Sequence, residues 1–387
     1  MKKISQQVGV VMVLITMILG CFGLNGHAAN HNLTKYITKQ ADPAWSVQAA
    51  NGLLYTANAG ENSGNVSVIN LKTQKLIKVI NLGNDVKHNN LTDVHYCLAD
   101  GQYVYAITAM HGRVYVINTK TNQVVKQIKT VGNDINYDSA NIDLSRHHMY
   151  IGREDNKIDV LNTQTQKFEA PISTASLLQG TGMDRGEVQA LEVAGHTLYF
   201  GILVSSTSQY GFTSCIVGEY NLYTHHLQRY LFPGVAGETK PTPTLVSAQG
   251  IEGLAVVEDQ QGNPFLYVTS NIAQGELDIF DLTSKHVVAT YNNFKKTLPG
   301  RVFGMVNLPN NRVGVGEMDS DGAHMLTFDA TKNSGKGGKL VSNVVVIPGR
   351  ANAGCVTWFL ANGGSQIVAP DLNSSDGNIW VFDRPSS

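Results

Sequence analysis

Apolar and polar residues alternate along most of the chain, and the alternating stretches resemble one another. In the stretch GNVSVINLKTQKLIKVINLG at 64–83, the apolar side chains of Val66 and Val68 alternate with polar ones. The stretch then turns at LKTQ and alternates again. A period of two residues is typical of β-strands, so this stretch predicts a β-hairpin. A similar stretch, GRVYVINTKTNQVVKQIKTVG, follows at 112–132.

The same strand ending, an apolar strand closed by Asn or Asp, occurs seven times. Asn and Asp suit this place because their side chains bond the backbone two residues on and begin a turn. A second strand precedes each copy, and a further candidate strand precedes that one. Four strands in a period of roughly 40 to 50 residues are typical of one blade of a β-propeller. The seven copies end at Asn70, Asn118, Asn162, Asn221, Asp281, Asp329 and Asp383.

The two ends of the chain complete this pattern. The seventh copy has three strands before the chain ends, while LTKYI at 33–37 resembles LIKVI at 76–80, the fourth strand of the first copy. An open row of blades would leave two sheet edges free to pair with other chains. We therefore predict an all-β fold, a seven-bladed β-propeller whose ring is closed by an N-terminal strand that completes the last blade. Residues 30–387 would form this single domain.

Residues 1–29 have the pattern of a signal peptide. Lys2 and Lys3 are followed by an apolar run at 8–24, which is short for a membrane span, and no later stretch could cross a bilayer. The pattern is bacterial and predicts a periplasmic or secreted protein without a transmembrane segment after cleavage. Cys21 follows ILG, a partial match to a bacterial lipobox, so lipid anchoring through this cysteine is an alternative.

The composition of the chain limits the classes of partner and the state of the cysteines that we expect. The net charge of −1 shows no basic excess, which argues against nucleic acid as a partner. A closed ring buries its own core, so we expect a monomer. The three cysteines after residue 29, Cys97, Cys215 and Cys355, are odd in number and far apart, so we expect buried thiols rather than a disulfide framework.

Acidic residues recur near the beginning of the predicted first strands. In a propeller these strands begin where ligands usually bind, at the mouth of the central channel. Twelve residues before the second-strand tyrosine, with a correction for a longer turn in the fifth copy and a match within one residue in the sixth and seventh, the seven copies have Pro43, four carboxylates, one arginine and Cys355. Repulsion between carboxylates raises their pKa or recruits a cation, and the arginine could hold an anion. The alternative is a set of unrelated solvated loop residues. The candidates are Asp93, Asp138, Glu187, Glu252 and Arg301.

The stretch EMDSDG offers a second candidate site. Glu317, Asp319 and Asp321 place oxygen ligands at alternate positions before a glycine, like the beginning of a loop that binds Ca²⁺ or another divalent cation. Apolar residues occupy the ninth and twelfth positions of such a loop, so the later ligands are missing. Asp and Gly are also ordinary turn residues, which leaves a plain turn as the alternative.

The stretches LYTANAGENSGNVSVINLKTQKLIKVINLG and LYVTSN at 266–271 resemble the YVTN-repeat β-propellers, part of a group of quinoprotein-like and lactonase-like seven-bladed propellers. The resemblance is strong over the first, second and fifth copies. It implies the propeller fold. Proteins of this group include adhesion or scaffold proteins, lactone hydrolases and cofactor enzymes, so the resemblance leaves several functions open.

These observations support one leading function and one alternative. The leading hypothesis is an exported binding or scaffold propeller that recognises a small polar ligand or a protein partner at the cell envelope. The alternative is a metal-dependent or acid/base hydrolase of lactone-like substrates with Glu252 as the catalytic candidate, because GIEGLAVVED resembles the strand starts of propeller hydrolases. A quinone-dependent dehydrogenase is a weaker reading, since the chain has only three tryptophans and no tryptophan motif in each copy.

Overall fold

In the computed structural model, the described part of the chain consists almost wholly of β-strands. The structure describes residues 34–37, 44–58, 64–73, 75–82, 94–130, 135–205, 214–229, 250–270, 276–292, 301–319, 322–333, 335–348, 359–361, 365–370 and 378–383. The predicted signal peptide with Cys21 and the candidate ligands Asp93 and Asp321 lie outside these residues.

The described strands form seven antiparallel sheets, six with four strands and one with five. The first comprises β2 (Ala44–Ala50), β3 (Leu53–Asn58), β4 (Asn65–Asn70) and β5 (Lys75–Asn81). The second comprises β6 (Val94–Ala99), β7 (Tyr103–Thr108), β8 (Arg113–Asn118) and β9 (Gln123–Lys129). The third comprises β10 (Tyr137–Asp143), β11 (His148–Arg153), β12 (Lys157–Asn162), β13 (Lys167–Phe168) and β14 (Ile172–Ser173). A short 3-10 helix, η1 (Ala175–Leu178), leads to the fourth sheet.

The remaining sheets repeat the same order. The fourth comprises β15 (Arg185–Ala194), β16 (Thr197–Ser205), β17 (Ser214–Asn221) and β18 (Leu227–Arg229). The fifth comprises β19 (Ile251–Glu258), β20 (Pro264–Ser270), β21 (Glu276–Asp281) and β22 (His286–Asn292). The sixth comprises β23 (Arg301–Leu308), β24 (Arg312–Asp319), β25 (Gly322–Asp329) and β26 (Lys339–Pro348). The seventh comprises β27 (Phe359–Ala361), β28 (Gln366–Pro370), β29 (Asn378–Asp383) and the N-terminal strand β1 (Thr34–Ile37).

The recurring Asn or Asp begins a turn at the end of the third strand, as the sequence predicts. Asn118 Oδ1 accepts hydrogen bonds from the backbone N–H groups of Lys120 and Thr121, at 2.9 and 3.2 Å. Asp281 makes the same two bonds with the two backbone N–H groups at positions 283 and 284. These side-chain bonds replace backbone partners at the turn, which is why the alternating stretches end at this residue type.

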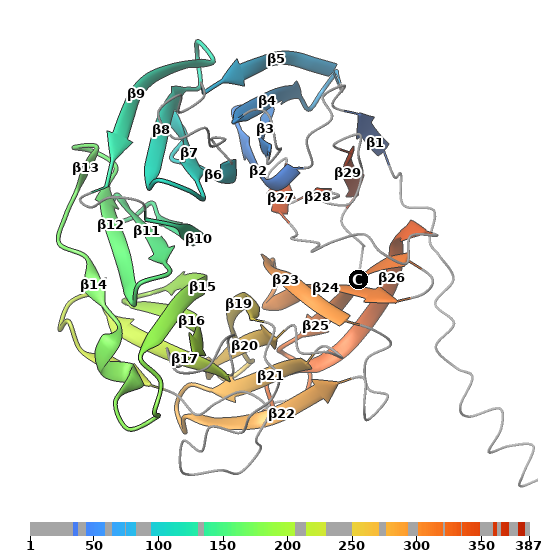
Figure 1. Ribbon diagram of the computed structural model, residues 1–387. Helices are drawn as coiled ribbons and strands as arrows, with labels where there is room; N and C mark the ends of the chain where they lie inside the picture. Colours follow the sequence, from blue (N-terminus) through green and yellow to red (C-terminus); the bar gives the residue numbers. More distant parts are fainter. Residues whose placement is uncertain are drawn as a thin grey trace, which may run out of the picture. The chain divides into compact units, whose positions relative to one another are not determined.

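The sheets follow one another around a common centre (Figure 1). The first strands of successive sheets contact one another from β2 through β6, β10, β15 and β19 to β23, and β2 also contacts β27 and β28. Strand β1 pairs with β29, with Thr34 opposite Val381 and Ile37 opposite Asn378. The chain thus brings its first described strand to the edge of its last sheet.

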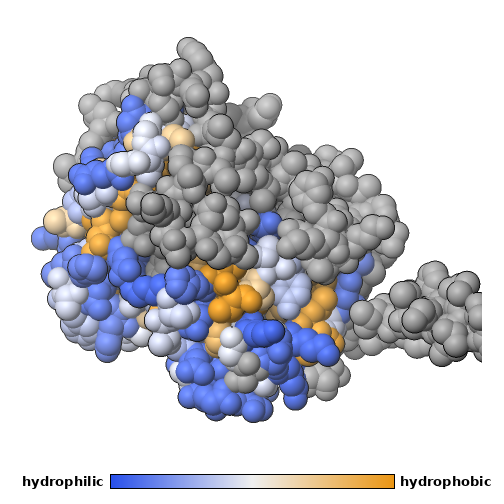
Figure 2. Space-filling model, turned by 90° about the horizontal axis from the view of Figure 1, so that it is seen from below, coloured by the Kyte–Doolittle hydropathy of each residue, from blue (hydrophilic) through white to orange (hydrophobic). Residues whose placement is uncertain are grey.

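The core lies between neighbouring sheets. Tyr55 and Val94, for example, belong to one buried cluster that joins the first sheet to the second. Cys97 and Cys215 are buried free thiols, as predicted, and Cys355 lies outside the described residues. On the side shown in Figure 2 the described surface is mostly hydrophilic, with apolar residues in separate patches. No helix in the described part of the chain is both long and apolar enough to span a membrane.

Candidate functional site

The first strand of five sheets contains a register shift at one residue near its beginning. In β10 the shift falls between Tyr137 and Ser139, and in β19 it falls between Ile251 and Gly253. A bulge residue has no partner in the ladder, so its side chain can be turned toward a site beside the sheet. The residues at these shifts are Trp45, His95, Asp138, Gln189 and Glu252.

The length of the turn after the first strand determines whether a count of twelve residues back from the second-strand tyrosine ends at the bulge residue. In the third sheet, with a long turn between β10 and β11, counting twelve residues back from Tyr150 gives the bulge residue Asp138. In the fourth sheet the turn is shorter, so the same count from Tyr199 passes the bulge and gives Glu187. In the fifth sheet, the count corrected for turn length ends at Glu252, which is the bulge residue.

Three carboxylates meet at the beginning of β10 and β15. Asp138, Glu154 and Glu187 each contribute one carboxylate oxygen to a group in which these atoms lie within 4.8 Å of one another. Asp138 and Glu187 are two of the residues predicted from the sequence. Glu154, which the prediction missed, comes from the loop between β11 and β12. The signal that could have found it is its place between a second and a third strand, since these loops gather at the same mouth.

Hydrogen bonds hold two of these carboxylates in place. Gln189 Nε2 donates to Glu187 Oε1 at 2.8 Å, and Asn136 Nδ2 donates to Glu154 Oε2 at 3.0 Å. Asp138 is different, because its buried Oδ2 atom accepts no hydrogen bond from a donor group in the described part of the chain, and its side-chain neighbour is the carboxylate of Glu187, which it can bond only if one of the two is protonated. A buried carboxylate oxygen without a partner is costly unless a proton or a cation compensates for it.

The electrostatics of the cluster also indicate that a proton or a cation compensates its charge. The pKa of Asp138 is raised far above its ordinary value, first by burial, then by its interaction with Glu187, and further by the charges of Glu154 and Glu252. Two neighbouring carboxylates in a buried site cannot both carry an uncompensated charge. Arg185 Nη2 lies 3.8 Å from Glu154 Oε2, but this arginine side chain is 53% exposed, so the pair adds little. The cluster therefore favours a shared proton or a bound cation.

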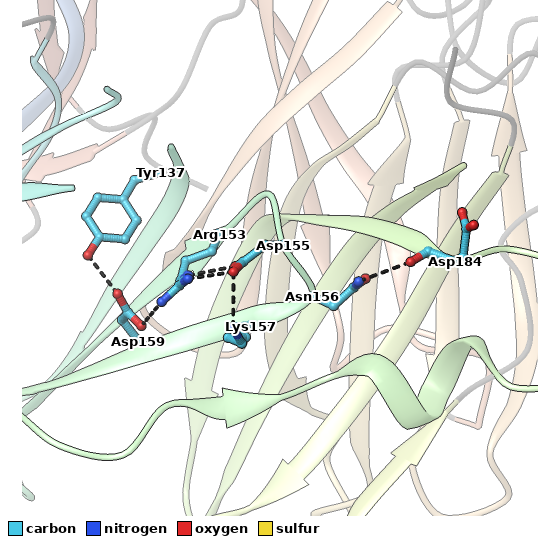
Figure 3. A network of polar contacts seen from close by, with 7 residues as sticks. All are labelled: Tyr137, Arg153, Asp155, Asn156, Lys157, Asp159 and Asp184. Carbon is cyan, nitrogen blue, oxygen red and sulfur yellow. Dashed lines mark hydrogen bonds and ion pairs between the residues drawn. The ribbon is translucent and has the colours of Figure 1, made fainter. Parts of the chain in front are cut away.

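A buried polar network supports the strands that carry the cluster (Figure 3). The hydroxyl of Tyr137 donates to Asp159 Oδ2 at 2.7 Å, and Arg153 Nη1 donates to Asp159 Oδ1 at 2.9 Å. Arg153 also forms two hydrogen bonds with Asp155, at 2.7 and 2.5 Å, and Lys157 reaches the same carboxylate at 3.2 Å. The arginine fork is thus satisfied by two carboxylates, only one of which is buried.

Two residues of this network directly precede residues of the carboxylate cluster in the sequence. Tyr137 is opposite Arg153 in the ladder between β10 and β11. Each is followed by a residue of the cluster, Asp138 and Glu154 respectively. The hydroxyl of Ser139 then donates to the backbone oxygen of Val188 at 2.6 Å, which fixes β10 against β15. The geometry of the cluster therefore depends on contacts within and between two sheets.

Among the candidates with described side chains, Glu252 and Glu317 are not members of this three-carboxylate group. Arg301 begins β23 and Asp319 ends β24. Glu317 lies within β24 and is fully buried, with Oε2 3.9 Å from His324 Nδ1 on the facing strand. The stretch EMDSDG thus belongs to a hairpin in which Asp319 is opposite Gly322. Within the described residues, the carboxylates of the third and fourth sheets form the one group close enough to hold a metal ion.

Comparisons with known proteins agree on the fold alone. No protein-family model matches the chain, and no curated protein sequence matches it. The chain is similar in structure to the WD40 repeats of RRP9, with a TM-score of 0.63 and 9% identity over 91% of this chain and 97% of that one. It is similar to U3-55K, with a TM-score of 0.64 and 10% identity over 91% and 98% of the two chains.

A third solved structure is similar in fold to this chain. Hydrazine synthase of Kuenenia stuttgartiensis matches with a TM-score of 0.62 and 15% identity, over 94% of this chain and 99% of that one. The three chains are 9–15% identical to this one, and a likeness at such identity shows fold rather than function. The chain has an all-β, propeller-type fold.

Proposed function

We propose that this chain is an exported binding protein with a closed ring of seven blades, and that it holds a divalent cation at Asp138, Glu154 and Glu187. The observation that carries the proposal is the group of three carboxylates around the buried Oδ2 atom of Asp138, which accepts no hydrogen bond from a donor group in the described residues and faces the carboxylate of Glu187. Calcium is the best candidate, since carboxylate and amide oxygens are its preferred ligands. A bound cation would serve as the contact point for a small polar ligand or a protein partner.

The proposed ring uses every described sheet. Pairing of β1 with β29 supports closure, because it covers an edge that would otherwise be open. The seven sheets and the contacts between their first strands support seven blades. The same proposal includes membership of the YVTN-repeat group, periplasmic or secreted localisation, and a monomeric state.

Cation binding is tested by thermal melting of the full chain after treatment with EDTA and dialysis. We expect Ca²⁺ to raise the melting temperature by a few degrees, because a ligand at 100 times its Kd stabilises the folded state by about 2.7 kcal/mol. Asp138→Asn and Glu187→Gln should abolish this increase. Glu258→Gln removes an exposed carboxylate at the far end of β19 and should leave it unchanged.

Two results would contradict cation binding at this site. One is a melting temperature that does not respond to Ca²⁺, Mg²⁺ or Mn²⁺. The other is an increase that survives in both Asp138→Asn and Glu187→Gln, since the cation would then bind elsewhere. Isothermal titration of the same proteins would give the stoichiometry, which we expect to be one cation per chain.

A hydrolase of lactone-like substrates is the second candidate, and a specific observation favours it. Asp138 has a raised pKa beside Glu187, and the charge of Glu252 contributes to that shift. A carboxyl group whose pKa is raised by burial and by neighbouring carboxylates is a candidate general acid. A screen of lactones and esters with the wild-type chain tests it. Turnover that is lost in Glu252→Gln would support the hydrolase, and turnover that this variant retains would contradict a role for Glu252.

A further inference from the structure

The outer strands of the first two sheets carry a basic surface. Strands β5 and β9 are the last strands of these neighbouring sheets, and in the described ladders each pairs with one strand, β5 with β4 and β9 with β8 (Figure 1). The stretches 70–82 and 118–130 contain these strands and the turns before them, and they have six lysines and no acidic residue. The lysines are Lys72, Lys75, Lys78, Lys120, Lys126 and Lys129.

The positive charge of this surface is not paired within the described residues. None of the six lysines takes part in an ion pair there. Lys126 donates to the backbone oxygen of Gln166 at 3.0 Å, a contact that leaves its charge without a counter-charge. By contrast, Lys285 in the turn before β22 lies 3.0 Å from the carboxylate of Glu219. Since the whole chain has a net charge of −1, the excess of positive charge is local.

Apolar side chains are exposed between these lysines. They occupy the sixth and seventh positions after the Asn that closes the third strand, in both sheets. The exposed fraction is 36% for Leu76, 49% for Ile77, 37% for Val124 and 55% for Val125. Single exposed apolar residues are normal on a protein, but four at repeated positions beside lysines make one surface both apolar and basic.

A β-bulge holds the more exposed residue of each pair. The ladder between β4 and β5 skips Ile77, and the ladder between β8 and β9 skips Val125. A bulge bends the strand and re-aims its side chain, and it hinders the addition of a further strand at the edge. These edges are therefore poorly suited to pair with an extended peptide, whereas their side chains are accessible to a partner that needs no ladder.

Hydrogen bonds fix the second outer strand against the first sheet. The hydroxyl of Tyr55 donates to Asn122 Oδ1 at 2.6 Å, and Asn122 directly precedes β9. Asn51 Nδ2 donates to the backbone oxygen of Gly101 at 2.8 Å, which joins the same two sheets. The two outer strands thus belong to one connected pair of sheets, and a broad partner can contact both.

We propose that the outer strands β5 and β9 dock on an anionic lipid surface. The lysines approach the negatively charged headgroups, while Ile77 and Val125 enter the boundary between headgroups and acyl chains. Lipid is favoured over an acidic peptide because the bulges oppose strand addition. It is also favoured over the same surface of a second copy, since two basic surfaces repel each other. The carboxylate cluster lies on the third and fourth sheets, so this proposal does not depend on cation binding.

The test places a fluorophore at position 77 in Ile77→Cys and records its emission with lipid vesicles. The full chain is used with Cys21→Ser and Cys355→Ser, because Cys97 and Cys215 are buried and stay unlabelled. Vesicles of phosphatidylglycerol should shift the emission to shorter wavelength, and vesicles of phosphatidylcholine should not. About 1 M NaCl should abolish the shift, since it reduces the screening length to about 3 Å. The fluorophore reports the surroundings of position 77, so lipid contact by residues 1–29 does not produce the shift.

The sixth sheet offers matched controls. Val341 is also skipped by the ladder of an outer strand and is 44% exposed, and a fluorophore in Val341→Cys should show no shift. Lys75→Gln and Lys129→Gln should each lower the affinity for phosphatidylglycerol vesicles about fivefold, measured by titration at position 77. Lys332→Gln, in the turn before β26, should leave this affinity unchanged.

Three results would overturn the proposal. The first is the absence of a shift at position 77 with phosphatidylglycerol, which would leave the lysines and bulges as protection of an open sheet edge. The second is an equal shift at position 341 or with phosphatidylcholine, since the contact would then not belong to this basic surface. The third is a shift of the same size with polyglutamate, which would assign the surface to an acidic polypeptide.

Discussion

The side-chain amide of Asn307 on β23 donates a 2.6 Å hydrogen bond to Oε1 of Glu192 on β15, so one contact joins the sixth sheet to the fourth. Asn141 of the third sheet donates to the other oxygen of Glu192 at 3.2 Å. A single carboxylate thus connects the first strands of three sheets. Burial raises the pKa of Glu192 to about 7, although the two amide bonds act in the opposite direction.

This contact predicts a pH dependence of stability. Because the pKa of Glu192 is higher in the folded than in the unfolded state, its favourable contribution is complete below about pH 4. The contribution is lost as the pH rises through about 7. Glu192→Gln cannot ionise and should flatten this part of the pH profile, measured by urea unfolding at pH 4.5, 6 and 7.5. An equally steep decline in the variant would contradict the prediction.

The carboxylate cluster predicts that a loss of charge stabilises the protein when no cation is bound. The raised pKa of Asp138 means that its ionisation opposes folding more strongly as the pH rises above the ordinary carboxyl range. At pH 8 in EDTA, Asp138→Asn should increase the free energy of unfolding by about 1–3 kcal/mol. Denaturant unfolding measures it, with Glu258→Gln as a control expected to change little. A decrease in the Asp138 variant would show that its carboxylate is already compensated within the protein.

The network in Figure 3 predicts unequal effects at two cationic residues. Arg153→Met would leave the buried carboxylate of Asp159 without its charged partner, and should lower the free energy of unfolding by about 3–5 kcal/mol. Lys157→Met removes an exposed pair with Asp155 and should cost less than about 1 kcal/mol. Chemical unfolding of both variants checks this, and similar losses would disprove the assigned difference.

A close approach at Gly152 predicts sensitivity to a single methyl group. An added Cβ would overlap the backbone oxygen of Val188 and the side chain of Ser139, where the third and fourth sheets meet. Gly152→Ala should lower stability by about 1–3 kcal/mol, measured as a decrease in melting temperature. Adding Ser139→Ala should not restore the wild-type value, because the backbone oxygen cannot be removed. Full recovery in the double variant would place the clash at Ser139 alone.

The turns at Asn118 and Asp281, and the strands before them, could be read from consecutive residues. Their causes are local, since alternation selects a strand and a side-chain oxygen begins the turn. The pairing of β1 with the last sheet was also predictable, because an incomplete final copy and a matching N-terminal strand occur in the same chain. The sequence by itself therefore determined the all-β repeat and two members of the candidate site, Asp138 and Glu187.

Only the tertiary structure decided which side chains meet. Glu154 joins the cluster from a loop outside the counted repeat position. In the fourth sheet the count gives Glu187 although the bulge residue is Gln189, because turn lengths differ between sheets. These relationships depend on register and on packing between sheets, and a local pattern of polar and apolar residues does not encode either of them.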